Sequence, residues 1–112
     1  MVNKQMRYWG IVLPGLPAQA MALYPFMLFK NEELKRNKKI IFHEQIHFRQ
    51  QVELLLILFY LLYAVNYLFN YLRFKNHHKA YANICFEREA YRNEDNIEYL
   101  ATRRPFAWSK LM

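Results

Sequence analysis

The stretch that decides the fold is IIFHEQIHFRQQVELLLILFYLLYAVNYLFNYL, residues 40–72. It contains neither glycine nor proline, and leucine, glutamate, glutamine and alanine are common in it. These residues have high helix propensity, so the stretch predicts a long helical segment. Its middle, residues 54–65, is apolar on every side, which is typical of a helix buried in a core or in a membrane.

The helical stretch opens with the pentapeptide His43-Glu44-Gln45-Ile46-His47. Residues i and i+4 of a helix lie one turn apart on the same face, so His43 and His47 can hold one metal ion together. Two imidazoles in this arrangement suit Zn²⁺, and Glu44 beside them can take a proton from a water molecule. The H-E-x-x-H pattern therefore predicts a zinc site, and the alternative is a surface helix with two solvated histidines.

A catalytic zinc needs three protein ligands and an open position, so a third ligand is expected after His47. No third histidine follows at the spacing of the longer H-E-x-x-H-x-x-G-x-x-H pattern. We expect Glu87 to be this ligand, in preference to Glu89, whose stripe of the helix looks solvated. His77 and His78 are less favoured alternatives for the third ligand. The residues that share the helix face of Glu87 are Tyr91, Glu94 and Glu98.

The flanking regions predict shorter elements. Residues 1–19, broken by Pro14, Gly15 and Pro17, read as an irregular lead-in. Residues 20–29 are rich in aromatic side chains and predict a strand, which Pro25 restricts to a sheet edge or a bulge. Residues 30–39 form a charged connector, and residues 81–100 read as a second, polar helix that ends before Pro105.

The apolar segment from Val52 to Leu72 could span a bilayer as one helix of about 31 Å. A straight span would place His47 and Glu87 on opposite sides of the membrane. We therefore expect a helical hairpin with its tip around residues 66–73, which dips into one leaflet or packs on a partner. The expected fold is mainly α: one domain over residues 1–112, with a long H-E-x-x-H helix, an antiparallel second helix and a short N-terminal strand.

The amino-acid composition and net charge of the chain exclude several classes of protein. The chain has 112 residues, 54% hydrophobic, with a net charge of +7 and a lone cysteine, Cys85. This excludes a disordered chain and a disulfide-stapled domain, and a lone thiol fits a reducing compartment. The positive charge suggests anionic headgroups as partners rather than nucleic acid, because no basic stretch has the pattern of a recognition helix. We expect membrane association facing the cytoplasm, with burial of the apolar segment in a homo-oligomer as the alternative.

The arrangement of the two motifs resembles that of the gluzincins, zinc peptidases with H-E-x-x-H on one helix and a ligand glutamate on the next. The resemblance covers residues 20–98 and is strongest to the membrane-embedded types, the CAAX-prenyl proteases and the β-lactam-sensor antirepressor peptidases. An apolar segment separates the two motifs there, as residues 54–72 do here. The second motif of the group often reads E-x-x-A-D or E-x-x-A-N, and here it reads Glu87-Arg88-Glu89-Ala90-Tyr91.

The resemblance implies that His43, His47 and Glu87 are zinc ligands and that Glu44 is the general base. It implies a zinc-dependent metallopeptidase acting on a peptide or protein substrate at or near a membrane. Tyr91 stands where the group has an acidic or amide residue that orients a ligand histidine, and Glu94 or Asn83 could substitute for it. The alternative function is a non-catalytic membrane or interaction module with a vestigial or structural zinc site.

Overall fold

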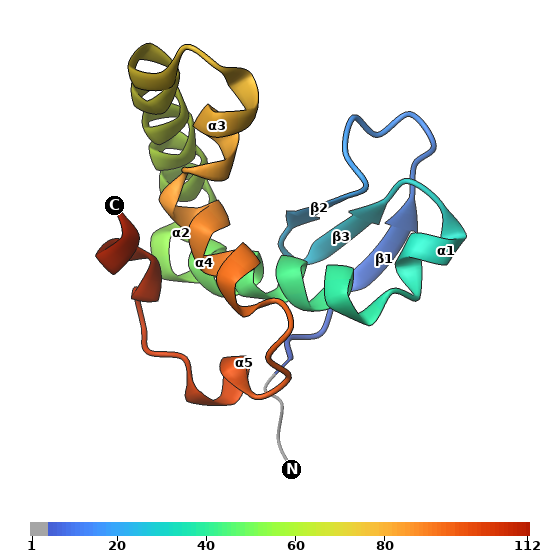
Figure 1. Cartoon of the computed structure of the whole chain (residues 1–112). Coiled ribbons are helices and arrows are strands. Elements are labelled where there is room, and N and C mark those ends of the chain that lie inside the picture. The colour runs from blue at the N-terminus through green and yellow to red at the C-terminus, as the bar shows by residue number, and fades with distance from the viewer. Residues whose placement is uncertain (1–4) are drawn as a thin grey trace.

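A computed structural model describes residues 5–112 of the chain (Figure 1). The molecule is mainly helical, with one long helix and a small three-stranded sheet, as expected at this level. Four of the residues in the predicted irregular lead-in, 1–4, lie outside the described part. The elements are β1 (Trp9–Val12), β2 (Ala20–Leu23), β3 (Phe26–Phe29), α1 (Glu32–Lys35), α2 (Lys38–Phe74), α3 (His77–Ala82), α4 (Cys85–Asn93), α5 (Tyr99–Thr102) and the 3₁₀ helix η1 (Ala107–Leu111).

The sheet has the strand order β1-β3-β2, with β3 parallel to β1 and antiparallel to β2. The prediction of an irregular segment over residues 1–19 is therefore wrong for β1. The prediction of a single edge strand over residues 20–29 is also wrong, because this stretch is two strands joined at Tyr24 and Pro25. Proline lacks an N–H donor, and it lies in the turn, just before β3. As a result β3 is the central strand and β2 forms an open edge.

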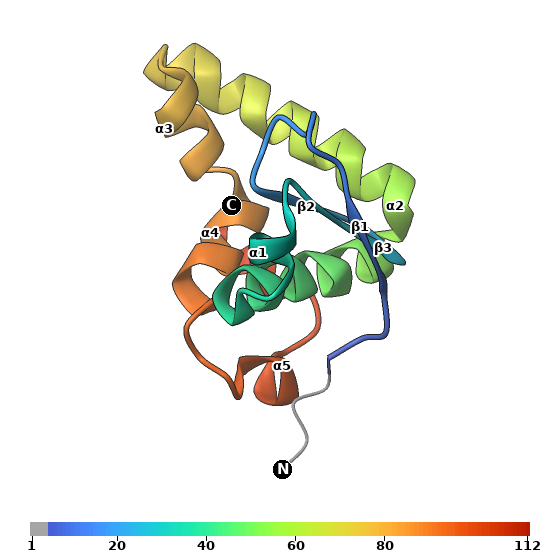
Figure 2. The ribbon, with the colours of Figure 1, turned by 90° about the vertical axis from the view of Figure 1, so that its right-hand side faces the viewer.

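Helix α2 bends sharply at Leu55, whose backbone dihedrals are φ 57° and ψ 143°. The bend divides α2 into a first half, residues 38–54, and a second half, residues 56–74. Figure 2 shows the two halves running in different directions from the bend, with the sheet between them. The second half therefore returns toward the H-E-x-x-H motif, and the ring of Phe59 lies 6.2 Å from that of His47.

The second half of α2 remains helical through the range where a hairpin tip was expected. The chain instead reverses after Phe74, at Lys75, which adopts a left-handed conformation with φ 53°. Asn66 and Asn70 contact the returning chain. The Asn66 side-chain oxygen accepts from the Cys85 N–H at 2.8 Å, and the Asn70 amide donates to the Ala80 carbonyl at 3.2 Å. Among the described residues, α2 is the helix whose length and apolar composition would allow it to cross a membrane.

The predicted second helix over residues 81–100 is three shorter helices, α3, α4 and α5. Helix α3 lies beside the far end of α2 (Figure 1), and α4 contacts both halves of α2. The breaks fall at Asn83 and after Asn93, where Glu94 and Asp95 form a turn. Asparagine and aspartate side chains favour turns because they bond to nearby backbone groups.

Two apolar clusters pack against the first half of α2 and hold its motif in place, and a third packs against the second half. One lies between the first half and the sheet, the second between the first half, α4 and α5, and the third between the second half, α4 and η1. Their buried members are Ala22, Met27, Phe29 and Phe48; Phe42, Ile46, Ala90 and Leu100; and Phe59, Ile84, Cys85, Phe86 and Trp108. The motif helix is thus covered on two faces, and its histidines point into the space that α4 closes.

Candidate metal centre

The structure brings together three residues that the sequence singles out. His43 and His47 project from the first half of α2, and Glu87 projects from the first turn of α4. All three are buried. Each histidine Nε2 lies 3.2 Å from Glu87 Oε1, and the two Nε2 atoms lie 3.2 Å from each other. Three potential ligand atoms therefore form a nearly equilateral triangle.

The triangle has the size that a tetrahedral zinc requires. With Zn–N and Zn–O bonds of about 2.0–2.2 Å, neighbouring ligand atoms are about 3.4 Å apart. Three protein ligands also leave the fourth position of a tetrahedron for water or substrate. The residues present therefore fit a catalytic rather than a closed structural zinc site.

The outer nitrogen of His43 is held by a carboxylate. His43 Nδ1 lies 2.7 Å from Glu94 Oε1, so it donates its proton there, and the lone pair of the neutral ring is at Nε2. Tyr91, which replaces the expected acidic or amide residue, packs its ring against that of His43 with centroids 4.5 Å apart. Glu94 thus occupies the orienting role, while Asn83 bonds to the Lys79 carbonyl instead.

The outer nitrogen of His47 is held by Gln50, one turn along α2. His47 Nδ1 lies 2.7 Å from Gln50 Oε1. The amide orientation of Gln50 follows from its other end, where Nε2 donates to the Phe86 carbonyl at 3.1 Å and to Glu89 Oε1 at 2.8 Å. With Nδ1 of both histidines held in this way, Nε2 of each faces the centre of the triangle.

Glu87 is oriented by a tyrosine from the second half of α2. The Tyr63 hydroxyl donates to Glu87 Oε2 at 2.6 Å, which leaves Oε1 facing the histidines. Burial raises the pKa of Glu87, but the charge and hydrogen bond of His47, together with the nearby His43 ring, outweigh it and hold the pKa well below its usual range. Burial lowers the pKa of His47, but Glu87 outweighs this effect and raises it to about 9. The centre of the triangle therefore favours a positive charge.

Glu89 was expected on a solvated stripe of its helix, but its surroundings are different. Its side chain is buried, not solvated, and it forms a buried ion pair with Arg103. The same carboxylate accepts from the Tyr99 hydroxyl at 2.6 Å, and Arg103 also pairs with Glu53 at 2.7 Å. Glu89 thus fastens the C-terminal segment to α2 and α4 and is not one of the three converging ligands.

Glu44 lies between two cavities that open onto the cluster. One, of about 460 Å³, is lined by polar groups that include His43, Tyr81 and Glu94. The other, of about 270 Å³, is lined mainly by apolar groups of β2 and of the second half of α2. Burial raises the pKa of Glu44, partly offset by the two histidines, and its carboxylate accepts a hydrogen bond from the backbone of Ala22. A carboxylate in this setting is a suitable general base.

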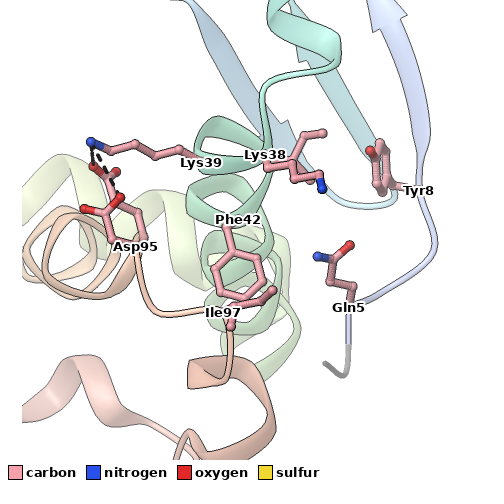
Figure 3. A pocket seen from close by; sticks show the side chains of 9 residues that line it. Gln5, Tyr8, Lys38, Lys39, Phe42, Asp95 and Ile97 are labelled. Carbon is pink, nitrogen blue, oxygen red and sulfur yellow. Dashed lines mark ion pairs between the residues drawn. The ribbon is translucent and has the colours of Figure 1, made fainter. Parts of the chain in front are cut away.

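A further cavity, of about 430 Å³, lies beside the same helix and away from the triangle (Figure 3). Its rim carries Lys39, whose amine lies 3.4 Å from Glu94 Oε2 and 3.7 Å from Asp95 Oδ1. Lys39 therefore steadies the carboxylate that holds His43. This side chain is more than half exposed, so its contribution to stability is small.

The alternative ligands His77 and His78 lie at the start of α3, and both are exposed. His77 Nδ1 lies 2.8 Å from the Tyr67 hydroxyl, so these histidines stay apart from the cluster. Sequence reasoning missed Gln50 and Tyr63. The i+3 spacing from His47 could have indicated Gln50, whereas Tyr63 reaches Glu87 only because α2 bends.

Comparisons with protein-family models, with curated proteins and with solved structures found no match to this chain. The resemblance to gluzincins therefore rests on the two motifs and on the residues described above.

Proposed function

We propose that this chain is a zinc-dependent metallopeptidase that acts at or near a membrane. The observation that carries the proposal is the convergence of two imidazole nitrogens and one carboxylate oxygen at mutual distances of 3.2 Å. Atoms this close require a positive charge among them, which is a proton on His47 in the metal-free chain and would be the metal ion in the loaded one. Each of the three side chains is also held by a partner outside the triangle, as is usual for metal ligands.

A zinc ion bound by these residues would polarise the scissile carbonyl and make water more acidic. Glu44 takes the proton from the attacking water and passes it to the leaving amine. Tyr81 lines both cavities beside Glu44, and its hydroxyl is the donor that we assign to a developing oxyanion. The pKa of Tyr81 is raised by burial and by Glu87, so its proton is retained for that role.

The membrane part of the proposal rests on the second half of α2. Seven of its large apolar side chains are at least 48% exposed, and they follow helical spacing along one stripe: Ile57, Leu58, Leu61, Val65, Leu68, Phe69 and Leu72. Arg73, Lys75 and Lys79 lie at its far end. An apolar stripe flanked by basic groups suits the surface of a bilayer with anionic headgroups.

The deciding experiment is metal analysis of purified protein together with a hydrolysis assay on a mixed peptide library. We expect one zinc per chain, loss of zinc in His47→Ala, and full retention in the matched control His78→Ala. Glu44→Gln should keep zinc and lose all hydrolysis. A native chain that takes up no added zinc contradicts the proposal, and a zinc-loaded chain without hydrolysis supports the non-catalytic alternative.

A further inference from the structure

The cavity of about 270 Å³ beside Glu44 is lined mainly by apolar side chains. Its walls come from β2 on one side and from the second half of α2 on the other, with Met21, Phe59 and Tyr60 among them. Glu44, His47 and Glu87 also line it. The apolar space therefore adjoins the residues that would carry out hydrolysis.

The open edge of β2 gives a peptide backbone a place to bind. Gln19 and Lys30 share a ladder hydrogen bond, and the register pairs Ala20 with Phe29 and Ala22 with Met27. The alternation of an antiparallel ladder then turns the backbone groups of Ala20 and Ala22 away from β3.

The outward backbone groups of Ala20 and Ala22 are not equally available to bind a peptide. The Ala22 carbonyl accepts from Gln51 and from Tyr60, each at 2.9 Å, and its N–H bonds to Glu44. The outward groups of Ala20 have no protein partner among residues 5–112. Ala20 lines both the polar and the apolar cavity, so it lies where an added strand would pass Glu44.

The order of the two cavities along β2 indicates which part of a bound peptide would meet which cavity. Both cavities reach Ala18 and Ala20, and within β2 the apolar cavity alone continues along the strand to Met21 and Ala22. An antiparallel peptide runs against the direction of β2, so its N-terminal part meets the apolar cavity and its C-terminal part the polar one. Antiparallel pairing is also the commoner choice.

We propose that the apolar cavity selects substrates with a large apolar side chain, such as leucine or phenylalanine, at the residue before the cleaved bond. This inference rests on the proposed peptidase function and names the substrate class of the same site. Met21 is the specificity-determining residue best placed for a test, because its side chain is 37% exposed and tolerates a change.

The test maps cleavage sites in a random peptide library with the zinc-loaded chain. We expect large apolar residues before the cleaved bond to be enriched at least tenfold over aspartate and lysine, as burial of such a side chain predicts. Met21→Glu should shift the preference to lysine and arginine. The matched control is Leu23→Glu, on the same strand and 41% exposed but outside the cavity, and it should keep the native preference.

Cleavage without an apolar preference, or equal effects of the two substitutions, overturns the inference and leaves the peptidase function standing. A second measurement covers a chain that does not hydrolyse. Glu44→Gln with added zinc is titrated with fluorescent peptides that differ only in leucine or lysine at the central position. Binding at least tenfold tighter for leucine supports the cavity assignment without turnover, and equal binding overturns it.

Discussion

At the scale of single residues, two glutamates two positions apart on α4 have different surroundings. Glu87 faces the histidines, and Glu89 is buried against Arg103. We predict that Glu87→Gln loses zinc in dialysis, because the neutral amide removes the anionic ligand. Glu89→Gln should retain zinc but lower the free energy of unfolding by about 3–5 kcal/mol, since it leaves the Arg103 charge buried with one partner fewer.

Zinc content after dialysis and urea unfolding measure the two effects separately. Glu89 contacts Gln50, which holds His47, so Glu89→Gln is also expected to weaken zinc, by no more than about 10–100-fold. If Glu89→Gln releases zinc while Glu87→Gln keeps it, the ligand assignment is wrong.

The raised pKa of His47 predicts opposite pH dependences for the metal-free and zinc-loaded forms. In the metal-free chain the pKa is 6.5 when unfolded and about 9 when folded. The extra stability is complete below pH 6.5 and is lost as the pH rises through 9, an expected fall of about 3 kcal/mol. Zinc-loaded protein should instead become more stable over this window, because fewer protons compete for the ligands.

Chemical unfolding at pH 6.5 and pH 9, with and without zinc, checks this prediction. The same sign of change in both forms would contradict a shared site for the proton and the metal. His78→Ala, a change at an exposed histidine, should follow the native curves.

Spacing paired His43 with His47, and Glu87 was favoured as the third converging residue over Glu89, His77 and His78 by its helix face and by the resemblance to gluzincins. The i, i+4 separation fixes His43 and His47 on one face, and the helix face of Glu87 could be assigned from its neighbours. Glu89 was misjudged because its partner, Arg103, is 14 residues away and reaches it through a turn. Such a contact has no periodic signal in the sequence.

At the scale of the elements, the bend at Leu55 determines whether the site can form. It returns the second half of α2 to the motif, so Tyr63 reaches Glu87 and Tyr60 reaches Ala22. A reversal was expected near Asn66 so that His47 and Glu87 could meet. The chain instead bends at Leu55 and reverses at Lys75. Leucine is a strong helix former, so nothing in the apolar run marks Leu55 as a bend.

Leu55 is strained in this conformation, because a positive φ is unfavourable for a residue with a branched side chain. We predict that Leu55→Gly raises the free energy of unfolding by about 1 kcal/mol, since glycine accepts this φ and the leucine side chain is 71% exposed. Leu55→Pro should abolish zinc binding, because proline fixes φ near −65° and straightens or breaks the bend.

Urea unfolding in detergent and metal analysis test both variants. Leu61→Gly, in the helical and exposed part of the second half, is the matched control and should destabilise by about 1 kcal/mol. A stabilising effect of glycine at both positions, or at neither, would contradict the strained bend.

At the scale of the whole molecule, the arrangement of the helices bears on the proposed membrane association, for which it suits a surface position better than a crossing. The second half of α2 exposes one stripe, while its other side packs on α3, α4 and η1. A helix alone in a bilayer would be lipid-exposed on every side. Helix α3 beside it carries exposed His78 and Lys79, which suit the headgroup region.

We predict that the native protein floats with vesicles containing anionic lipid and that Leu61→Ser lowers its partition about tenfold or more, since burial of one leucine contributes about 1.5–3 kcal/mol. Ile97→Ser is the matched control, because Ile97 is 62% exposed against 56% for Leu61 and lies outside the helices. It should partition like the native chain, and both variants should keep zinc.

Reversing the charge of two basic residues, Lys75→Glu with Lys79→Glu, should weaken binding to anionic but not to neutral vesicles. Equal partition of Leu61→Ser and Ile97→Ser would show that the stripe does not meet lipid, and the apolar face of α2 would then have to be covered by another protein surface.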